Sequence, residues 1–413
     1  MKDENNPNII SLERSLGGSR SEFSTGFQAE SVTPFDEIAI PLRPHIVPGL
    51  LTRKQLTILV GPPGASKSTF AAQAAIAIAT GVGWGGFENA EQCKGLIIAK
   101  EEDGDEHNRR IAAFLQIMNK SQVEIENQLF RATEEQCAKF TVTKAENDGT
   151  IIAAPVVAML CEYIQDNKIG FVIVDPFAET MEGDENATAD MKRTAMIYRD
   201  QIARPTNAAL MLIHHTPKYA KGMAGDMDAS RGSGTLVGVA RNVTTLFPAK
   251  EADQSILGCK QDEVFKYVRV DGAKANQTLI TGQAKWFEKK SITIANGDEV
   301  GALKPIKPKG ILGRFSVQKL REALVELERG FQIEEKGQTF RIYYSDHGNS
   351  KKRHPFEKIQ TILHCNIDEA KAVIKEWIKQ GIIFVEDYRN EQRRENEKRL
   401  KTDPDKWPGE VEK

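Results

Sequence analysis

The feature that most constrains this chain is a glycine-containing loop between an apolar strand and an alanine-rich helix. Residues 56–60 read LTILV, and residues 61–68 follow as GPPGASKS, close to the phosphate-loop pattern GxxxxGK[ST]. In that pattern, backbone N–H groups of the loop and of the helix start surround a chain of phosphates. The chain is therefore expected to fold around a buried parallel strand that ends at a nucleotide site.

Individual loop positions have expected parts in binding ATP and Mg²⁺. Lys67 is expected to reach the β- and γ-phosphates, and the Ser68 hydroxyl to bind Mg²⁺. Ser66 stands where the pattern has glycine, and a side chain there is expected to crowd the loop and slow hydrolysis rather than prevent binding. The residues expected to contact ATP are Gly61, Pro62, Pro63, Gly64, Ala65, Ser66, Lys67, Ser68 and Thr69.

Three further apolar runs, residues 95–100, 171–175 and 209–215, are separated by helical stretches. Near-continuous apolar runs of this kind are typical of parallel strands that are covered on both faces. The predicted fold class is therefore α/β, with a mostly parallel central sheet. Asn-Gly-Asp at 296–298 also predicts a turn between two strands within 291–303.

Acidic side chains follow two of these runs, and the carboxyl ends of parallel strands meet at one edge of a sheet. Asp175 is in the position of a Walker B acid, which binds Mg²⁺. Glu101, Glu102 and Asp103 follow the preceding run, where one carboxylate is suited to orient or deprotonate an attacking water. A phosphate-hydrolysing site is predicted at this edge.

The order of these motifs resembles the RecA-like ATPases of the plasmid RepA type, relatives of the DnaB-type replicative helicases that are common on phages and mobile elements. The similarity spans about residues 40–290. The resemblance implies a RecA-like P-loop core and a homo-oligomeric, hexameric ring that acts on DNA. The segments that carry it are GPPGASKST (61–69), LIIAKEED (96–103), FVIVDP (171–176), MLIHHT (211–216) and SRGSGTLVGVAR (230–241).

The resemblance also implies roles for the acidic residues. The catalytic carboxylate falls on Glu102, with Glu101 as the alternative, and the Walker B acid falls on Asp175. An arginine pair that follows the first of these in the family falls on Arg109 and Arg110.

Histidines and basic residues complete the implied site. The strand-end motif falls on His214 and His215, which would couple the γ-phosphate to loops that bind nucleic acid; ordinary hydrogen bonding at the sheet edge is the alternative. In ring ATPases of this type a basic residue of one subunit completes its neighbour's site. Arg231, Arg241 and Lys274 are the candidates, and the sequence does not choose between them.

Two loops of this fold are able to face the centre of a ring. Loop 176–190 carries five carboxylates and no Lys or Arg, so it is expected to repel phosphates. Loop 216–234 is glycine-rich and carries Lys218, Tyr219 and Lys221. Basic residues beside an aromatic ring suit single-stranded nucleic acid, so we predict that this second loop contacts DNA.

Beyond the ATPase core, the sequence predicts a small α+β domain of the winged-helix type. A helix over 356–365, a helix over 367–380 ended by Gly381, and a strand over 382–388 follow the order of a winged helix-turn-helix. Lys371, Lys375 and Lys379 lie off the apolar stripe of the second helix, where they would contact the phosphates of duplex or forked DNA, or simply be solvated. Further basic residues around this layout are Lys351, Lys352, Arg353, Lys358, Arg389, Arg393 and Arg394. The predicted parts of the chain are a flexible tail (1–36), the ATPase domain (37–303), a Pro/Lys linker (304–312), the winged-helix-like domain (313–402) and a second tail (403–413).

Composition bears on partners and location. Residues 301–413 carry 24 basic and 19 acidic side chains, a charge of +5, whereas the rest of the chain carries −7. This asymmetry favours a polyanion as partner of the C-terminal part, although two ordinary domains of different charge would also account for it. The five cysteines lack CxxC spacing, and neither a signal peptide nor a membrane-spanning run is evident, so we expect a cytoplasmic protein without a membrane partner.

The combined prediction is an ATP-hydrolysing RecA-like motor on DNA, a ring-forming replicative helicase of the RepA type. Two alternatives stay open. In the first, the chain is an ATP-dependent DNA-binding switch or loader without unwinding activity. In the second, it is a regulatory ATPase that acts on a protein partner.

Overall fold

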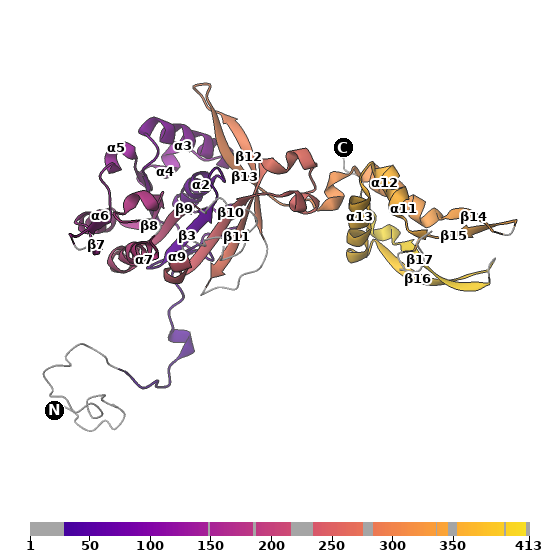
Figure 1. The fold of residues 1–413 in the computed structure, drawn as a ribbon, viewed down its shortest axis with the longest axis horizontal. Helices are drawn as coiled ribbons and strands as arrows, with labels where there is room; N and C mark the ends of the chain where they lie inside the picture. Colours follow the sequence, from indigo (N-terminus) through magenta and orange to yellow (C-terminus); the bar gives the residue numbers. More distant parts are fainter. Residues whose placement is uncertain are drawn as a thin grey trace. The chain divides into compact units, whose positions relative to one another are not determined.

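The computed structural model describes residues 29–147, 149–184, 187–215, 234–275, 284–335, 337–345, 353–391 and 394–409. The chain divides into two compact units, Met1–Pro44 and His45–Lys413 (Figure 1). The described part of the first unit holds a single 3-10 turn, η1 (Glu37–Ala39), none of whose residues is buried. None of the helices in the described ranges is long and apolar enough to cross a membrane.

The second unit is built on a sheet in which nine strands are described, in the order β13-β12-β11-β10-β3-β9-β8-β4-β5. Its parallel strands are β3 (Leu56–Gly61), β4 (Lys94–Ala99), β5 (Leu129–Ala132), β8 (Ile169–Asp175), β9 (Ala209–His215) and β10 (Asn242–Pro248). The antiparallel strands are β11 (Tyr267–Ala275), β12 (Lys285–Thr293) and β13 (Glu299–Ile306). The four predicted strands are confirmed as β3, β4, β8 and β9, which are neighbours in the sheet. The α/β class with a mostly parallel sheet is confirmed with them.

Helices and short strand pairs surround this sheet. The helices of the core are α2 (Lys67–Ala79), α3 (Gly104–Met118), α4 (Gln122–Ile125), α5 (Glu134–Cys137), α6 (Val156–Asp166), α7 (Thr188–Ile197), α8 (Arg204–Thr206), α9 (Gly234–Val239) and α10 (Gln254–Leu257). The short pairs are β1 (His45–Val47) with β2 (Leu51–Thr52), and β6 (Thr143–Ala145) with β7 (Ile151–Ala153). A π-helical turn, η3 (Tyr198–Ala203), extends α7.

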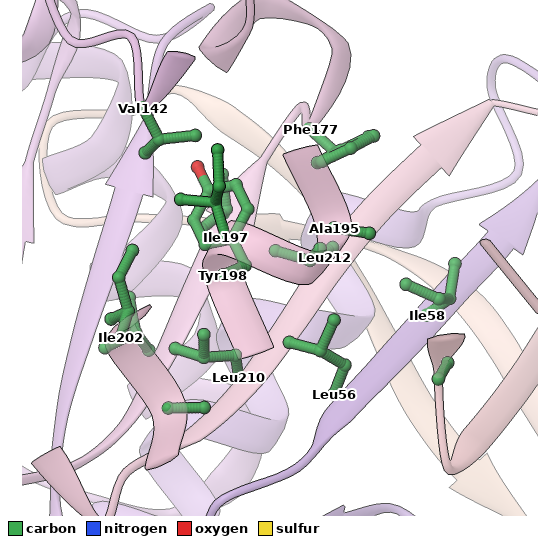
Figure 2. Packing of buried hydrophobic residues seen from close by; sticks show 14 of the residues in the cluster. Leu56, Ile58, Val142, Phe177, Ala195, Ile197, Tyr198, Ile202, Leu210 and Leu212 are labelled. Atoms are coloured by element: carbon green, nitrogen blue, oxygen red, sulfur yellow. The ribbon is translucent and has the colours of Figure 1, made fainter. Parts of the chain in front are cut away.

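Side chains alternate between the two faces of the sheet because successive residues of a strand point to opposite sides. Leu56 and Ile58 of β3 join the cluster that includes Tyr198 of η3, and Figure 2 shows them on the same side as Leu210 of β9. Leu59 points to the other face, into the cluster that contains α2. Both faces are apolar and covered, which explains why the strand sequences are continuous apolar runs.

The predicted strand pair is confirmed as the antiparallel hairpin β12–β13, with its turn at 294–298. β13 runs to Ile306, so Lys304 and Pro305, which the Pro/Lys composition placed in a linker, pair with Glu288 and Phe287 of β12. The hairpin also holds α2. The Gln73 side-chain amide, fully buried, donates to the Leu303 carbonyl at 3.0 Å and accepts from the Leu303 N–H at 2.8 Å.

The C-terminal part of the second unit has its own core around the buried Trp377. Its elements are α11 (Val317–Arg329), β14 (Phe331–Glu335), β15 (Gln338–Ile342), α12 (Phe356–Leu363), α13 (Ile367–Lys379), β16 (Ile383–Asn390) and β17 (Glu395–Thr402). The two predicted helices and the strand after them are confirmed as α12, α13 and β16. Asn366 and Glu369 form a capping box at the start of α13, and Gly381, with φ 69°, follows its end.

Candidate nucleotide site

The phosphate loop leaves β3 at a point where two backbones approach closely. A Cβ atom on Gly61 would overlap the carbonyl oxygen of Leu246 in the neighbouring strand β10. Glycine is therefore required here by packing, independently of any ligand. The loop then enters α2 at Lys67, so the residues predicted to contact ATP, 61–69, form one continuous turn at the end of the strand.

Ser66 carries a backbone cost at the position where the pattern has glycine. Its φ of 71° and ψ of 33° lie in the left-handed region, and its hydroxyl makes no capping hydrogen bond to the helix. A residue with a Cβ atom pays about 1–2 kcal/mol in this conformation. Serine in place of the glycine of the pattern therefore strains the backbone of the loop.

Lys67 is 4% exposed and its ammonium group is fully engaged. Nζ donates to the carbonyl oxygens of Gly61 at 2.9 Å and Pro62 at 3.0 Å, and to Nδ1 of His215 at 3.0 Å. Burial lowers the pKa of Lys67 to about 8, against the opposing effect of the Asp175 and Glu101 carboxylates. The two carbonyl dipoles stabilise the positive charge of Lys67, and the oxygens of a phosphate are able to replace them.

Ser68 and Asp175 form the pair of oxygen donors expected for Mg²⁺. The Ser68 hydroxyl, in the first turn of α2, is hydrogen-bonded to the Asp175 carboxylate at the end of β8. Burial raises the pKa of Asp175, and the Ser68 hydrogen bond opposes this rise. A hydroxyl beside a carboxylate matches the hard-oxygen preference of Mg²⁺, so these residues fit the ion.

Glu102 lies next to this pair and is held by an arginine. Its Oε1 is 2.6 Å from Nη1 of Arg110 in α3. Burial raises the pKa of Glu102, whereas the charge of Arg110 lowers it. Asp103, the third acid of the predicted cluster, caps α3 by accepting from the Glu106 N–H at 2.7 Å, so its role is structural.

Strand register explains how these groups meet. Gly61 pairs with His215, and Asp175 with Ala99, so β3, β9, β8 and β4 end at the same edge. A cavity of about 20 Å³, room for about one water molecule, lies among Ser68, Glu102, Arg110 and Asp175. The residues predicted to act on the γ-phosphate therefore converge from three strand ends on one place. Their roles in catalysis stay predictions.

The two histidines at the end of β9 differ in environment. His215 is exposed and accepts a hydrogen bond from Lys67. His214 packs against the Phe177 ring, with 6.3 Å between ring centroids, and burial lowers its pKa to about 4. Of the pair, His215 is the one in contact with the phosphate loop.

Two of the candidates for completing a neighbour's site, Arg241 and Lys274, lie at the other edge of the sheet. Arg241 precedes β10 and its N–H donates to the carbonyl of Leu56, at the start of β3. Lys274 pairs with Val243 in the same region, and its ammonium group donates to the carbonyls of Val237 and Ala240 at 2.6 and 3.0 Å. β3 spans roughly 17 Å between this edge and the phosphate loop. Neither residue is placed to act at the candidate nucleotide site of the same chain, and Lys274 already binds the carbonyl end of α9.

Several predicted residues lie outside the described part of the chain. These are Lys218, Tyr219, Lys221, Arg231, Lys351, Lys352 and Arg393.

The predicted acidic loop, residues 176–190, is partly described. The Glu182 carboxylate accepts from the Ala145 N–H at 2.9 Å, and the Asp190 carboxylate accepts from the Asp184 N–H at 3.1 Å. These acids order their own loop.

In the C-terminal part, Lys371, Lys375 and Lys379 of α13 are all exposed, as the helical spacing predicted. Arg353 is different: it donates to the Tyr343 carbonyl and pairs with Glu397 at 2.9 Å. Its guanidinium thus joins segments within this domain.

Sequence reasoning missed the partners that hold the site together. The resemblance assigned an arginine pair to Arg109 and Arg110 but did not predict that Arg110 contacts Glu102; the i,i+4 spacing of Glu106 and Arg110 is the local signal nearby. The bond between Gln73 and Leu303 spans 230 residues and had no signal.

Comparison with known proteins agrees with this geometry. Residues 22–221 match a family model described as an AAA domain. This match covers the phosphate loop and the strands β3, β4, β8 and β9. A comparison with curated proteins gave no match. Among solved structures, a KaiC-like protein from the hyperthermophilic archaeon Pyrococcus horikoshii is similar, with 14% identity and a TM-score of 0.38 over 63% of this chain and 94% of that chain. The α/β architecture is established by the strand order itself.

The strain at Ser66 gives a first prediction. Ser66→Gly is expected to raise the free energy of unfolding by about 0.5–1 kcal/mol, since relief of the left-handed cost exceeds the extra freedom of glycine in the unfolded chain. Urea unfolding measures the change. Ser66→Ala is the matched control, because it removes the hydroxyl and keeps the Cβ atom. Equal stability of the two variants would contradict the assignment of strain.

A second prediction concerns His107, which is buried in α3 and lines the same small cavity. Burial, with Arg131 and Arg110 nearby, lowers its pKa from 6.5 to about 4. Between these values the unfolded chain binds more protons than the folded one, so stability falls as the pH is lowered through this window. The loss of unfolding free energy between pH 7 and pH 5 should be smaller in His107→Gln than in the wild type. His364→Asn, at an exposed histidine, should leave the loss unchanged.

Proposed function

We propose that the core hydrolyses ATP with Mg²⁺ and uses the reaction to act on DNA. One observation carries the proposal: Lys67 and Ser68 at the start of α2, Glu102 after β4 and Asp175 at the end of β8 meet at a single edge of the sheet. Each has the chemistry that phosphoryl transfer needs at that place.

The mechanism follows from the contacts of each residue. Ser68 and Asp175 would hold Mg²⁺, which supplies positive charge to the phosphates. Lys67 exchanges the carbonyls of Gly61 and Pro62 for phosphate oxygens, so its buried positive charge gains a negatively charged partner. Glu102 orients a water for in-line attack: a bond forms from the water oxygen to the γ-phosphorus as the bond to the bridging oxygen breaks.

His215 provides a route from the nucleotide to the loop that follows it. His215 accepts a hydrogen bond from Lys67, and a phosphate that binds Lys67 would remove this partner. Residues 216–234, the loop predicted to bind DNA, begin directly after His215. Exchange of one hydrogen bond would thus report the nucleotide state to the DNA-binding loop.

Assembly into a ring is part of this proposal. Arg241 and Lys274 lie at the edge of the sheet opposite the phosphate loop, so a role for either at an ATP site requires a second subunit. A ring of identical subunits supplies that contact at every site. A hexamer of the RepA type is the assembly we propose.

The C-terminal part is proposed to bind duplex or forked DNA as a winged helix. Two helices are followed by the antiparallel pair β16–β17, and the lysines of α13 are solvent-facing. Within the described ranges Lys371 pairs with Asp368 at 3.2 Å and Lys379 with Glu376 at 3.6 Å, each three residues away on the same helix. Such exposed pairs are weak and exchange readily for phosphates.

A second candidate function is an ATP-dependent DNA-binding switch or loader that does not unwind. One observation favours it: Ser66 strains the phosphate loop. Such strain would favour slow hydrolysis, with ATP stabilising one state of assembly.

The ATPase proposal makes a direct prediction. Glu102→Gln should lower kcat by about 100-fold or more while ATP binding is retained, because the loss affects activation of the water. Lys67→Ala should weaken binding and hydrolysis together. Steady-state hydrolysis with and without single-stranded DNA, and ATP binding by calorimetry, measure these effects.

The same substitution one residue away, Glu101→Gln, is the control. A larger loss in Glu101→Gln than in Glu102→Gln would move the catalytic role to Glu101. Hydrolysis that survives Lys67→Ala would contradict the proposed site. Size measurement with a non-hydrolysable ATP analogue tests the ring.

The DNA proposal predicts a change in salt dependence. Replacing Lys371, Lys375 and Lys379 by Ala should weaken duplex binding and lower the slope of log K against log salt by about two to three. Replacing the exposed Lys304, Lys307 and Lys309 makes the same change in charge outside α13 and should have little effect.

Strand displacement on a forked duplex then separates the motor from the switch. Displacement that depends on Lys67 supports the motor, and salt-sensitive binding without displacement supports the switch. If the protein has no salt-dependent affinity for any nucleic acid, a regulatory ATPase that acts on a protein partner is the remaining alternative.

A further inference from the structure

A chain of ion pairs leads away from Glu102 along α3 to the hairpin β12–β13. Arg110 contacts Glu102 at 2.6 Å through Nη1 and Glu106 at 3.2 Å through Nε. Glu106 also pairs with Arg109 at 3.4 Å, and Nε of Arg109 is 3.1 Å from Asp298 in the hairpin turn. The five charges alternate in sign along the whole path.

We infer that Arg110 is a positioning residue that holds the Glu102 carboxylate at the cavity beside Ser68 and Asp175, and that the hairpin turn supports it through Asp298 and Arg109. The inference rests on the proposed ATPase function and adds residues that act through Glu102.

The charges around Glu102 make a positive partner necessary. Glu101, Glu106 and Asp175 all act on Glu102 as like charges, and Arg110 is the cation that opposes them. Only 16% of the Glu102 side chain is exposed, so water contributes little to stabilising its charge. Without Arg110, the carboxylate would lower its energy by turning away from Asp175 or by taking up a proton.

Arg110 in turn is fixed by the helix that carries it. α3 begins directly after Glu102, at the Asp103 cap, and Arg110 lies two turns into the helix. Ala113, Phe114 and Leu115 bury the far half of α3 in a cluster that also contains Ile76 of α2. α3 therefore cannot shift without disturbing the helix that follows the phosphate loop.

The hairpin belongs to the same packed group. Ile294, Val300 and Ala302 of the hairpin join this cluster, and Asp298 reaches Arg109 from the turn. The turn itself is closed by Asn296, which donates to Asp298 at 2.8 Å. The Glu102–Arg110 pair is half-buried, whereas Arg109 and Asp298 are more exposed. We therefore expect the Arg109–Asp298 pair to contribute less to the position of Glu102 than Arg110 does.

Steady-state ATP hydrolysis by the full chain tests the inference. Arg110→Ala should lower kcat by about 100-fold, the scale of a misplaced catalytic group, with little change in KM for ATP. Arg110→Lys should recover part of the loss because it restores the charge without the planar geometry. Asp298→Asn should lower kcat by at most about fivefold, in keeping with an exposed pair.

A double-mutant cycle separates positioning from a merely structural role. If Arg110 acts through Glu102, then Arg110→Ala in the Glu102→Gln background should cause almost no further loss of kcat. Lys120→Ala removes another ion pair, Lys120 with Glu124 at 2.8 Å, at the far end of α3 and should leave kcat unchanged. Urea unfolding of each variant shows that the fold is retained.

The outcomes are distinct. Wild-type kcat in Arg110→Ala, or losses that multiply in the double variant, would overturn the inference while leaving the ATPase proposal intact. A wild-type protein that binds ATP but shows no hydrolysis dependent on Lys67 would overturn the ATPase proposal, and this inference with it.

Discussion

Parallel pairing of β3 with β9, of β9 with β8 and of β8 with β4 is the constraint from which the site follows. Parallel strands in register end together, so the chain delivers Gly61, His215 and Asp175 to one edge from segments that are far apart in sequence. The pairing is stable because both faces of these strands are covered by apolar clusters. Polar groups are confined to the strand ends, where they are close enough to share partners.

The charged groups of the site also have partners within the protein. Lys67 is buried and satisfied by two carbonyls and a histidine, and Glu102 is satisfied by Arg110. On the proposed mechanism phosphate oxygens replace the partners of Lys67, whereas Arg110 continues to hold Glu102. ATP binding, on the proposed mechanism, is an exchange of partners within a fixed scaffold, and it costs little rearrangement of the backbone.

The sequence predicted what depends on local pattern. Continuous apolar runs predicted β3, β4, β8 and β9, and the phosphate-loop spacing predicted where β3 passes into α2. It did not predict what depends on distant contacts. Lys304 and Pro305 resemble a linker in composition, yet they are held in β13 by pairing with β12. Nor did any local pattern show that Asp298 lies against Arg109, since this contact forms only when the hairpin packs on α3.

The bond between Gln73 and Leu303 has a consequence for how the chain is made and how it can be divided. The helix after the phosphate loop is near the start of the chain, but a buried amide on it is satisfied only by the last strand of the sheet. During synthesis, α2 must wait for more than two hundred later residues to leave the ribosome before its packing is complete. For the same reason, a fragment that stops at residue 221, where the match to the AAA domain ends, would expose that amide and the apolar face beside it.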